Sequence, residues 1–414
     1  MVNKSKAIAI ACSVLGLFLI GPVAAQAENS SRNGKQDESV QLGPRPFFLV
    51  NGMEDSELKD QLMQCRDGPF YRSDFSIAHR GAALQFPEHT KEAVEAGAQM
   101  GAGIIECDVT FTKDGALVCR HSECDLHTTT NIVATPLNNQ CTVPWTGASP
   151  PAPLPKCCTS DLTLAQFKSL KGKMDASNRS ATTAEGYLGG TASWRTDLYT
   201  SRGTLMTHAE YIQIVKVIAG KFTPELKYPD NPARVVAIFG SQENYAQKMI
   251  DEYKAARINP KNVWAQSFNL GDVAYWIQSE PKFGKQAVFL DSFPAPLPMT
   301  LAALKQMGVK IIAPPMQALL AVNAAGEIVP SQYAKDIQSF GFDIITWTFE
   351  RTDLRKGAAG VGGYYAFDPT GTAVKTDSDM YKALDVLARD VKILGIFSDW
   401  PATVTYYANC MGLK

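Results

Sequence analysis

From about Phe75 onward, short β-branched or apolar runs alternate with turns and with segments of helical periodicity. The strand candidates are FSIAHRG, GIIECDV, ALVCRH, FTPELK, NVWAQSF, QAVFLDS, VKIIAPP, DIITWTF and LGIFSDW. Helix-like segments lie between several of them, at residues 90–100, 207–219, 242–256 and 299–307. Such alternation indicates a parallel sheet covered by helices.

Polar side chains gather at or just after the carboxyl ends of these strand candidates. They are His79, Arg80, Glu106, Asp108, His121, Glu225, Lys227, Trp347 and Asp399. In an eight-stranded β/α barrel all strand ends meet at one mouth, whereas an open sheet brings only a few together. We therefore predict a TIM-type (β/α)8 barrel. Nine candidates are one too many, and we expect either residues 286–292 or residues 309–315 not to be a barrel strand.

The stretch from about 131 to 203 fits neither a strand nor a helix rhythm. We interpret it as an insertion between the third and fourth strands, packed beside the barrel mouth. A second irregular stretch, residues 357–372, is a candidate for another pocket wall. The predicted organisation is a signal peptide (1–27), an N-terminal arm (28–72), the barrel (73–408) and a short tail (409–414).

The N-terminus has the pattern of an export signal. Lys4 and Lys6 precede an apolar run over residues 7–20, and Ala25-Gln26-Ala27 offers small residues for cleavage after Ala27. The run is shorter than the roughly 20 residues that span a membrane. We expect a secreted or periplasmic protein without stable membrane insertion, with a retained anchor as the alternative.

Removal of the signal peptide would leave an even number of cysteines. They are Cys65, Cys107, Cys119, Cys124, Cys141, Cys157, Cys158 and Cys410. An even number in an exported chain predicts disulfide bonds, but about a hundred pairings are open. The absence of Cys-x-x-Cys spacing argues against a zinc site. Cys107 lies in an apolar run, where it is either bridged or part of the core.

The charges are balanced, with 40 basic and 41 acidic residues and no long run of either sign. No charged surface for nucleic acid or anionic lipid is therefore predicted. We expect a small-molecule partner, and the sequence does not define an oligomeric state.

Two carboxylates stand two residues apart in Glu106-Cys107-Asp108, so both face one side of a strand while Cys107 faces the other. Inside a barrel they would repel each other unless a cation lies between them, and a hard divalent metal suits carboxylate ligands. Glu225 and Lys227 share a face in the same way. Ordinary salt bridges at strand ends are the alternative.

His79 and His121 end two different strand candidates, which places two imidazoles at the predicted mouth. Imidazole is suited to proton transfer near neutral pH. Arg80 can contact a phosphate or a carboxylate with two parallel hydrogen bonds. The combination predicts acid–base chemistry on an anionic substrate.

These motifs resemble those of the glycerophosphodiester phosphodiesterase family. AHRGAALQFPEHT looks like its His-Arg-Gly to Pro-Glu-Asn-Thr motif, GIIECDVTFTKDGALVCRH like its Glu-x-Asp strand and second His, and TPELK like its third-carboxylate strand. The likeness continues in AQSF, WTFE and GIFSDWP. It covers most of the chain from about Phe75 to Pro401 and is nearest to the long secreted or periplasmic members.

The resemblance implies a role for each matched residue. Glu106, Asp108 and Glu225 would bind one divalent cation, Mg2+ or Ca2+. His79 and His121 would be general base and general acid, and Arg80 and Lys227 would stabilise charge on the phosphate. Trp347 would offer an aromatic face to the substrate, and Glu88 would help order the metal side. His89 replaces the usual Asn, so we assign it no catalytic role.

The expected reaction is metal-dependent hydrolysis of glycerophosphodiesters, such as glycerophosphocholine or glycerophosphoethanolamine, to glycerol 3-phosphate and an alcohol. Two alternatives remain. A phospholipase D of the sphingomyelinase type would act on intact lipids and would need an apolar rim that contacts the membrane surface. The sequence has no strongly amphipathic or polybasic segment that supports this alternative. A non-catalytic binding protein on the same barrel would tolerate loss of one His or carboxylate, and all are present.

Overall fold

The computed structural model describes residues 40–147 and 153–413. The predicted signal peptide and the first part of the predicted arm lie outside these residues. None of the helices within the described ranges has the length and apolar character that a membrane crossing requires.

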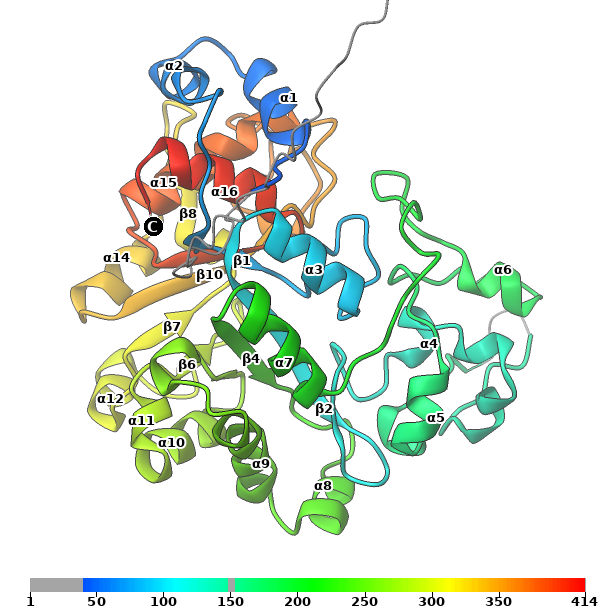
Figure 1. Ribbon diagram of the computed structural model, residues 1–414. Coiled ribbons are helices and arrows are strands. Elements are labelled where there is room, and N and C mark those ends of the chain that lie inside the picture. Colours follow the sequence, from blue (N-terminus) through cyan, green and yellow to red (C-terminus); the bar gives the residue numbers. More distant parts are fainter. Residues whose placement is uncertain (1–39, 148–152, 414) are drawn as a thin grey trace, which may run out of the picture. The chain divides into compact units, whose positions relative to one another are not determined.

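Eight parallel strands close into a barrel (Figure 1). They are β1 (Ser73–Ala78), β2 (Ala102–Phe111), β4 (Phe222–Leu226), β5 (Gln266–Ser267), β6 (Val288–Leu290), β7 (Ile311–Ala313), β10 (Asp343–Phe349) and β11 (Gly395–Ser398). The barrel closes because β1 pairs with β11 on one side and with β2 on the other. The predicted TIM-type architecture is confirmed.

The surplus strand candidate is ALVCRH, not one of the two that we expected to exclude. It forms β3 (Leu117–Cys119), which pairs antiparallel with β2 outside the barrel order. The Lys-Asp-Gly turn between these strands is far too short for a parallel crossover, which needs about a dozen residues. Our expectation for residues 286–292 and 309–315 was wrong, since β6 and β7 are both barrel strands.

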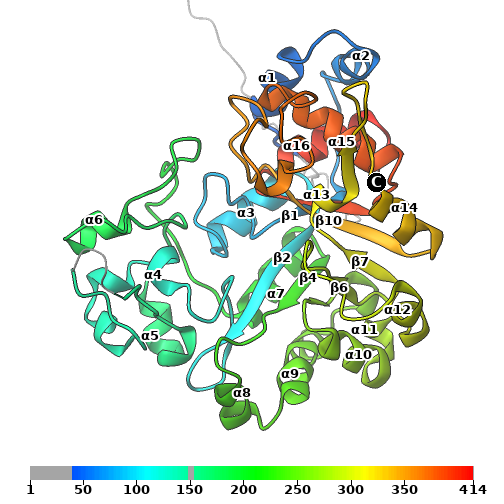
Figure 2. The same cartoon turned by 180° about the vertical axis from the view of Figure 1, so that it is seen from behind.

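Helices cover the outside of the barrel (Figure 2). The main ones are α3 (Lys91–Gln99), α7 (His208–Ile218), α9 (Gln242–Ala255), α10 (Leu270–Ser279), α12 (Leu301–Met307), α14 (Gln332–Ser339), α15 (Met380–Arg389) and α16 (Pro401–Cys410). Side chains of Thr90, Thr207 and Ser241 accept backbone N–H groups at the starts of α3, α7 and α9. Shorter elements are α8 (Pro232–Phe239), α11 (Pro281–Gly284), α13 (Met316–Leu319) and the hairpin β8 (Leu320–Val322) with β9 (Ile328–Pro330).

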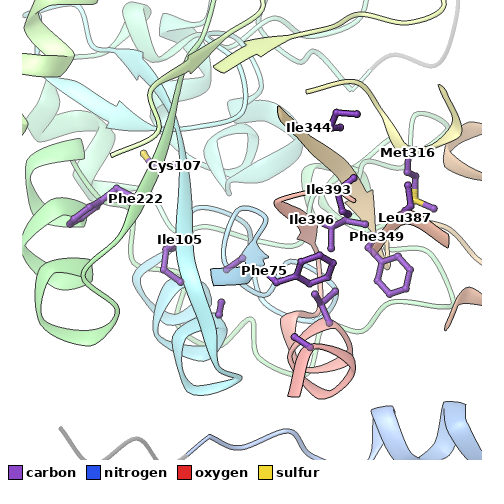
Figure 3. Close-up of a cluster of buried hydrophobic side chains, with 14 of the residues drawn as sticks. Phe75, Ile105, Cys107, Phe222, Met316, Ile344, Phe349, Leu387, Ile393 and Ile396 are labelled. Atoms are coloured by element: carbon purple, nitrogen blue, oxygen red, sulfur yellow. The ribbon is translucent and has the colours of Figure 1, made fainter. Parts of the chain in front are cut away.

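Alternation along the strands separates an inner from an outer core. Ile77, Ile104, Ile345 and Phe397 belong to a small cluster of buried side chains on the inner face of the barrel. The intervening positions on β2, β10 and β11 pack outward against the helices; Ile105, Cys107, Ile344 and Ile396 are drawn in Figure 3. On β2, Glu106 and Asp108 therefore follow Ile104 on the inner side, toward the carboxyl end.

The described residues between β3 and α7 form a lobe beside the barrel, with α4 (Leu126–Thr129), α5 (Leu164–Ser169) and α6 (Ala184–Leu188) (Figure 1). The lobe has its own apolar cluster, which includes Leu126, Leu162, Phe167 and Tyr187. Because β3 is not a barrel strand, this lobe enters between the second and third barrel strands. The predicted position between the third and fourth strands holds only when β3 is counted.

The described part of the predicted arm contains helices α1 (Arg45–Asn51) and α2 (Glu57–Gln64), which contact α16. A guanidinium nitrogen of Arg45 lies 2.6 Å from a carboxylate oxygen of Glu350, and Cys65 is bonded to Cys410. The beginning and the end of the described chain are thus fastened to each other.

All eight cysteines downstream of the predicted signal peptide form disulfides, as expected for an exported chain. The pairs are Cys65–Cys410, Cys107–Cys119, Cys124–Cys158 and Cys141–Cys157. The second pair ties β2 to β3 and settles the open question about Cys107. The last two pairs lie in and beside the lobe.

Removing the Cys65–Cys410 bond should destabilise the protein by about 4 kcal/mol, because a bond spanning 345 residues strongly restricts the unfolded chain. The test is urea unfolding of the double variant Cys65→Ser/Cys410→Ser without reductant. The paired variant Cys141→Ser/Cys157→Ser, which opens a span of 16 residues, should lose less. Equal losses in the two variants would contradict the chain-entropy explanation.

Candidate active site

A cavity of about 410 Å³ opens at the carboxyl ends of the barrel strands. Its lining includes seven of the predicted site residues: His79, Arg80, Glu106, His121, Glu225, Lys227 and Trp347. Asp108 is buried against them, with an oxygen 3.6 Å from Arg80 Nε and the other 3.9 Å from Lys227 Nζ. The structure thus brings the whole predicted set together.

Three carboxylates form one cluster on two neighbouring strands. Asp108 on β2 and Glu225 on β4 are register partners, and Glu106 lies one inward-facing position before Asp108. One oxygen from each lies within 4.8 Å of the others. This spacing and the all-oxygen donor set suit a hard divalent cation.

The electrostatics of the cluster also fit a cation. Burial and the charges of Asp108 and Glu225 raise the pKa of Glu106 well above its usual value. Burial likewise raises the pKa of Glu225 to about 8, although Lys227 opposes the shift. Asp108 Oδ1 is buried and accepts no hydrogen bond from the described residues. A divalent ion would relieve the repulsion and give this oxygen a ligand role.

Two cations border the cluster. Lys227 Nζ lies 2.6 Å from Glu225 Oε1, and Arg80 donates to Glu88 Oε2 at 2.9 Å. Arg80 has a φ of 56°, in the left-handed region that non-glycine residues rarely adopt, and its backbone N–H donates to Glu106 Oε2 at 2.8 Å. The strained backbone therefore positions both the guanidinium of Arg80 and the carboxylate of Glu106.

Close packing behind this strained turn depends on Gly81. It has a φ of 92°, and a Cβ placed there would lie 2.4 Å from the backbone carbonyl carbon of Ala93 in α3. Only glycine permits both the conformation and the close approach of α3.

His79 follows β1 and contacts a carboxylate from the other end of the chain. Its Nδ1 lies 2.5 Å from Asp399 Oδ1, which leaves Nε2 toward the cluster, 3.8 Å from Glu106 Oε2. Burial, together with the charge of Arg80, lowers the pKa of His79 to about 4. Burial opposes ionisation of Asp399, but Arg351 and His79 outweigh it and hold its pKa at about 2. An ionised Asp399 can fix the imidazole tautomer.

His121 reaches the cavity from the turn after β3. The backbone N–H of Arg120 donates to the carbonyl of Asp108 at 2.8 Å, which anchors this turn to β2. Burial lowers the pKa of His121 well below its usual value, and Arg80 and Lys227 add to the shift. The imidazole thus faces the same space as His79 from a separate segment.

Aromatic rings form the outer wall of the cavity. Trp347 meets Phe268 and Tyr364 in two T-shaped contacts, with centroid distances of 5.8 and 5.9 Å. Its indole N–H donates to the carbonyl of Ala313 at 2.9 Å, which fixes the ring. The wall offers apolar faces to a bound group opposite the charged cluster.

Sequence reasoning undervalued His89, whose Nε2 lies 2.8 Å from Asp108 Oδ2. It missed Arg351, which lines the cavity and donates to Asp399, and Asp175 in the lobe, to which Arg351 also donates. The replacement of the motif's usual Asn by His89 could have indicated that this residue contacts the carboxylate cluster. Neither Arg351 nor Asp175 stands in a recognisable motif.

Four other polar residues differ in their relation to the cavity. Gln266 lines the cavity and its Nε2 donates to Glu106 at 3.3 Å, whereas Asp291 lies outside the lining and accepts from Tyr333. His127 contacts the hydroxyl of Tyr187 in the lobe and does not line the cavity. His208 is buried on α7 against Glu252 and Tyr253 and does not line the cavity.

Solved structures share this fold at low sequence identity. A glycerophosphoryl diester phosphodiesterase from Silicibacter pomeroyi aligns with a TM-score of 0.55 at 16% identity, covering 86% of this chain and 98% of the other. A phosphodiesterase from Oleispira antarctica, solved with the product sn-glycerol-3-phosphate, aligns with a TM-score of 0.50 at 18% identity over 80% of this chain and 95% of the other. These likenesses confirm the fold.

Sequence comparison adds nearer relatives. An extracellular protein of Arthroderma benhamiae is 43% identical over 247 residues, which are 58% of this chain and all of the relative. A probable glycerophosphodiester phosphodiesterase of Mycobacterium tuberculosis is 51% identical over 47 residues, 11% of this chain and 17% of that protein. The model of the glycerophosphoryl diester phosphodiesterase family matches residues 79–403, nearly all of the barrel and the lobe. The chain therefore belongs to the glycerophosphoryl diester phosphodiesterase family and is a phosphodiesterase.

Proposed function

We propose that this phosphodiesterase hydrolyses glycerophosphodiesters, such as glycerophosphocholine and glycerophosphoethanolamine, to glycerol 3-phosphate and an alcohol. The observation that carries the proposal is one cavity at which a cluster of three carboxylates meets the cationic side chains of Arg80 and Lys227 and two imidazoles. The carboxylates account for a divalent ion, the cations for a phosphodiester anion, and the imidazoles for two proton transfers.

Glu106, Asp108 and Glu225 would hold one Mg2+ or Ca2+. When bound, this ion would offset phosphate charge and orient its oxygens. Arg80 and Lys227 lie beside the same cluster and would stabilise the charge that develops as a fifth oxygen approaches phosphorus. Both would act on the phosphate rather than on the head group.

His79 would be the general base, because Asp399 occupies Nδ1 and leaves Nε2 to accept the proton of the attacking hydroxyl. That hydroxyl would belong to the substrate's glycerol. As its oxygen bonds to phosphorus, the bond to the head-group oxygen breaks. The negative charge of the bound phosphate would favour the protonated form of His121, which would then supply the proton of the departing alcohol. Water would then open the cyclic phosphate and give glycerol 3-phosphate.

We propose that the enzyme works outside the cytoplasm. Four disulfides and the name of the Arthroderma benhamiae relative, an extracellular protein, support this location. We propose that the predicted signal peptide directs export and is cleaved after Ala27.

The decisive experiment incubates the mature protein with glycerophosphocholine and glycerophosphoethanolamine, with and without a chelator, and assays glycerol 3-phosphate. We expect release that stops with the chelator and returns when Mg2+ or Ca2+ is added. If neither substrate yields metal-dependent glycerol 3-phosphate, the proposed function is wrong.

One observation favours a second candidate, action on phosphodiesters at a lipid surface. After β6, residues 293–299 read FPAPLPM, carry no charge and are mostly exposed. After β10, Val361 is exposed within residues 357–367, a stretch without charged side chains that also supplies Tyr364 to the cavity lining. An uncharged apolar rim suits a lipid surface. Sphingomyelin vesicles incubated with the protein and assayed for free choline test this candidate, and release of choline from them would support it.

Trp347→Ala should raise KM by about tenfold and leave kcat within about twofold, because the ring contributes a binding face and no proton transfer. Steady-state kinetics on glycerophosphocholine provide the measurement. Trp400→Phe is the control, since Trp400 lies at the start of α16 and does not line the cavity. A fall in kcat alone would contradict a binding role for Trp347.

A further inference from the structure

A ring of charged contacts joins the lobe to the catalytic loop after β1. Asp399 accepts from His79 with Oδ1 and from Arg351 with Oδ2, at 2.5 and 2.8 Å. The other terminal nitrogen of Arg351 donates to Asp175 Oδ2 at 3.0 Å, and Asp175 Oδ1 lies 2.5 Å from Arg195. Asp175 and Arg195 both belong to the lobe.

The last contacts of the ring return to the loop after β1, which carries His79. Arg195 donates to the carbonyl of Ala83, and the next residue, Leu84, donates its N–H to the carbonyl of Asp399 at 3.0 Å. Ala83 stands four residues after His79. The lobe therefore holds both the loop that carries His79 and, through Arg351, the carboxylate that orients it.

The charged side chains of this ring are mostly buried, unlike those of ion pairs on the protein surface. Asp399 is fully buried, Arg195 is 8% exposed, and Asp175 and Arg351 are each 19% exposed at the side chain. Solvent screening is weak at such positions, so geometry and charge balance matter. Other charged residues around Arg351 are Arg80 and Glu88.

Glu88 makes the orientation of Arg351 depend on the charge of Asp175. Its Oε2 lies 3.7 Å from the same Arg351 nitrogen that donates to Asp175. If Asp175 lost its charge, Glu88 would become the nearest carboxylate for that nitrogen, and Arg351 would turn toward it. Such a turn would weaken the contact between Arg351 and Asp399.

Resting on the proposed function, we propose that Asp175 and Arg195 are positioning residues: through Arg351 they fix the Asp399 carboxylate that orients His79. The lobe thereby supplies part of the catalytic geometry without touching the reacting atoms. This role gives a reason for an insertion at this point of the barrel.

The test compares Asp175→Asn with a matched control, Lys168→Met. Lys168 in the lobe pairs with Glu210 on α7 at 2.6 Å, so its loss also removes a contact between lobe and barrel, but one away from the cavity. We expect Asp175→Asn to lower kcat on glycerophosphocholine by about 10-fold to 100-fold with KM within about twofold. Lys168→Met should retain wild-type kcat.

A second readout needs neither metal nor substrate. The proton between His79 Nδ1 and Asp399 should give a downfield proton NMR signal, assigned by its loss in His79→Gln. Asp175→Asn should shift or broaden this signal in the metal-free protein, whereas Lys168→Met should not. Arg195→Met interrupts the same ring and replaces Asp175→Asn if that variant does not fold.

Unchanged kcat and an unchanged downfield signal in Asp175→Asn would overturn the proposal. Equal kcat losses in Asp175→Asn and Lys168→Met would also overturn it, because they would reveal only loosened lobe packing. A wild-type protein without activity would instead refute the proposed function, and the NMR comparison would still decide whether the ring orients His79.

Discussion

Replacing His121 with Ala is expected to lower kcat on glycerophosphocholine by about 10³-fold, the usual scale for loss of a positioned proton donor. His121 lines the cavity from the turn after β3, on a segment separate from His79 and from the carboxylate cluster. The departing alkoxide would then leave without a proton. The measurement is glycerol 3-phosphate release at saturating substrate.

Two controls make this result specific. His127→Ala removes an imidazole that contacts Tyr187 in the lobe and should retain activity. A substrate whose head group leaves readily without protonation, such as a nitrophenyl phosphodiester, should recover much of the rate in His121→Ala. An equal loss on both substrates would contradict the assignment of His121 as the acid.

Replacing Asp108 with Asn is expected to lower kcat/KM by about 10³-fold and to weaken divalent-metal binding in parallel. The change keeps the size of the side chain but removes the charge from a buried oxygen that accepts no hydrogen bond within the described chain. Several kcal/mol of transition-state charge stabilisation are at stake, which corresponds to this range of rates. Calorimetric titration with Mg2+ and Ca2+ measures binding without substrate.

Asp291→Asn is the matched control for Asp108→Asn. Asp291 is also a buried carboxylate at the end of a barrel strand, but it accepts from Tyr333 and lies outside the cavity lining. This variant should bind metal as the wild type does. If Asp108→Asn retained full metal affinity, the carboxylate cluster would not be the metal site.

The sequence allowed prediction of the barrel and of the clustered site residues because both depend on short patterns. The spacing of Glu106 and Asp108 defines a shared face, and placement at strand ends brings distant segments to one mouth. The family motifs then added the expected roles. None of these steps requires knowledge of side-chain conformations.

The errors and omissions have different physical causes. β3 has the composition of a barrel strand, and only the shortness of its turn reveals that it runs antiparallel. Arg351 and Asp175 meet across 176 residues, and their pairing depends on how the lobe packs. The disulfide pairs likewise follow from tertiary contacts. Local sequence patterns carry no information about contacts between residues that lie far apart in the chain.

The pairing of β1 with both β2 and β11 has a consequence for fragments of the enzyme. His79 follows the first barrel strand, but its partner Asp399 follows the final barrel strand, 320 residues later. A fragment that stops before β11 lacks both the closing strand and this carboxylate. We therefore expect such a fragment to have neither a closed barrel nor a His79 imidazole with a fixed orientation, so shortened forms should be inactive even when they contain every predicted metal ligand.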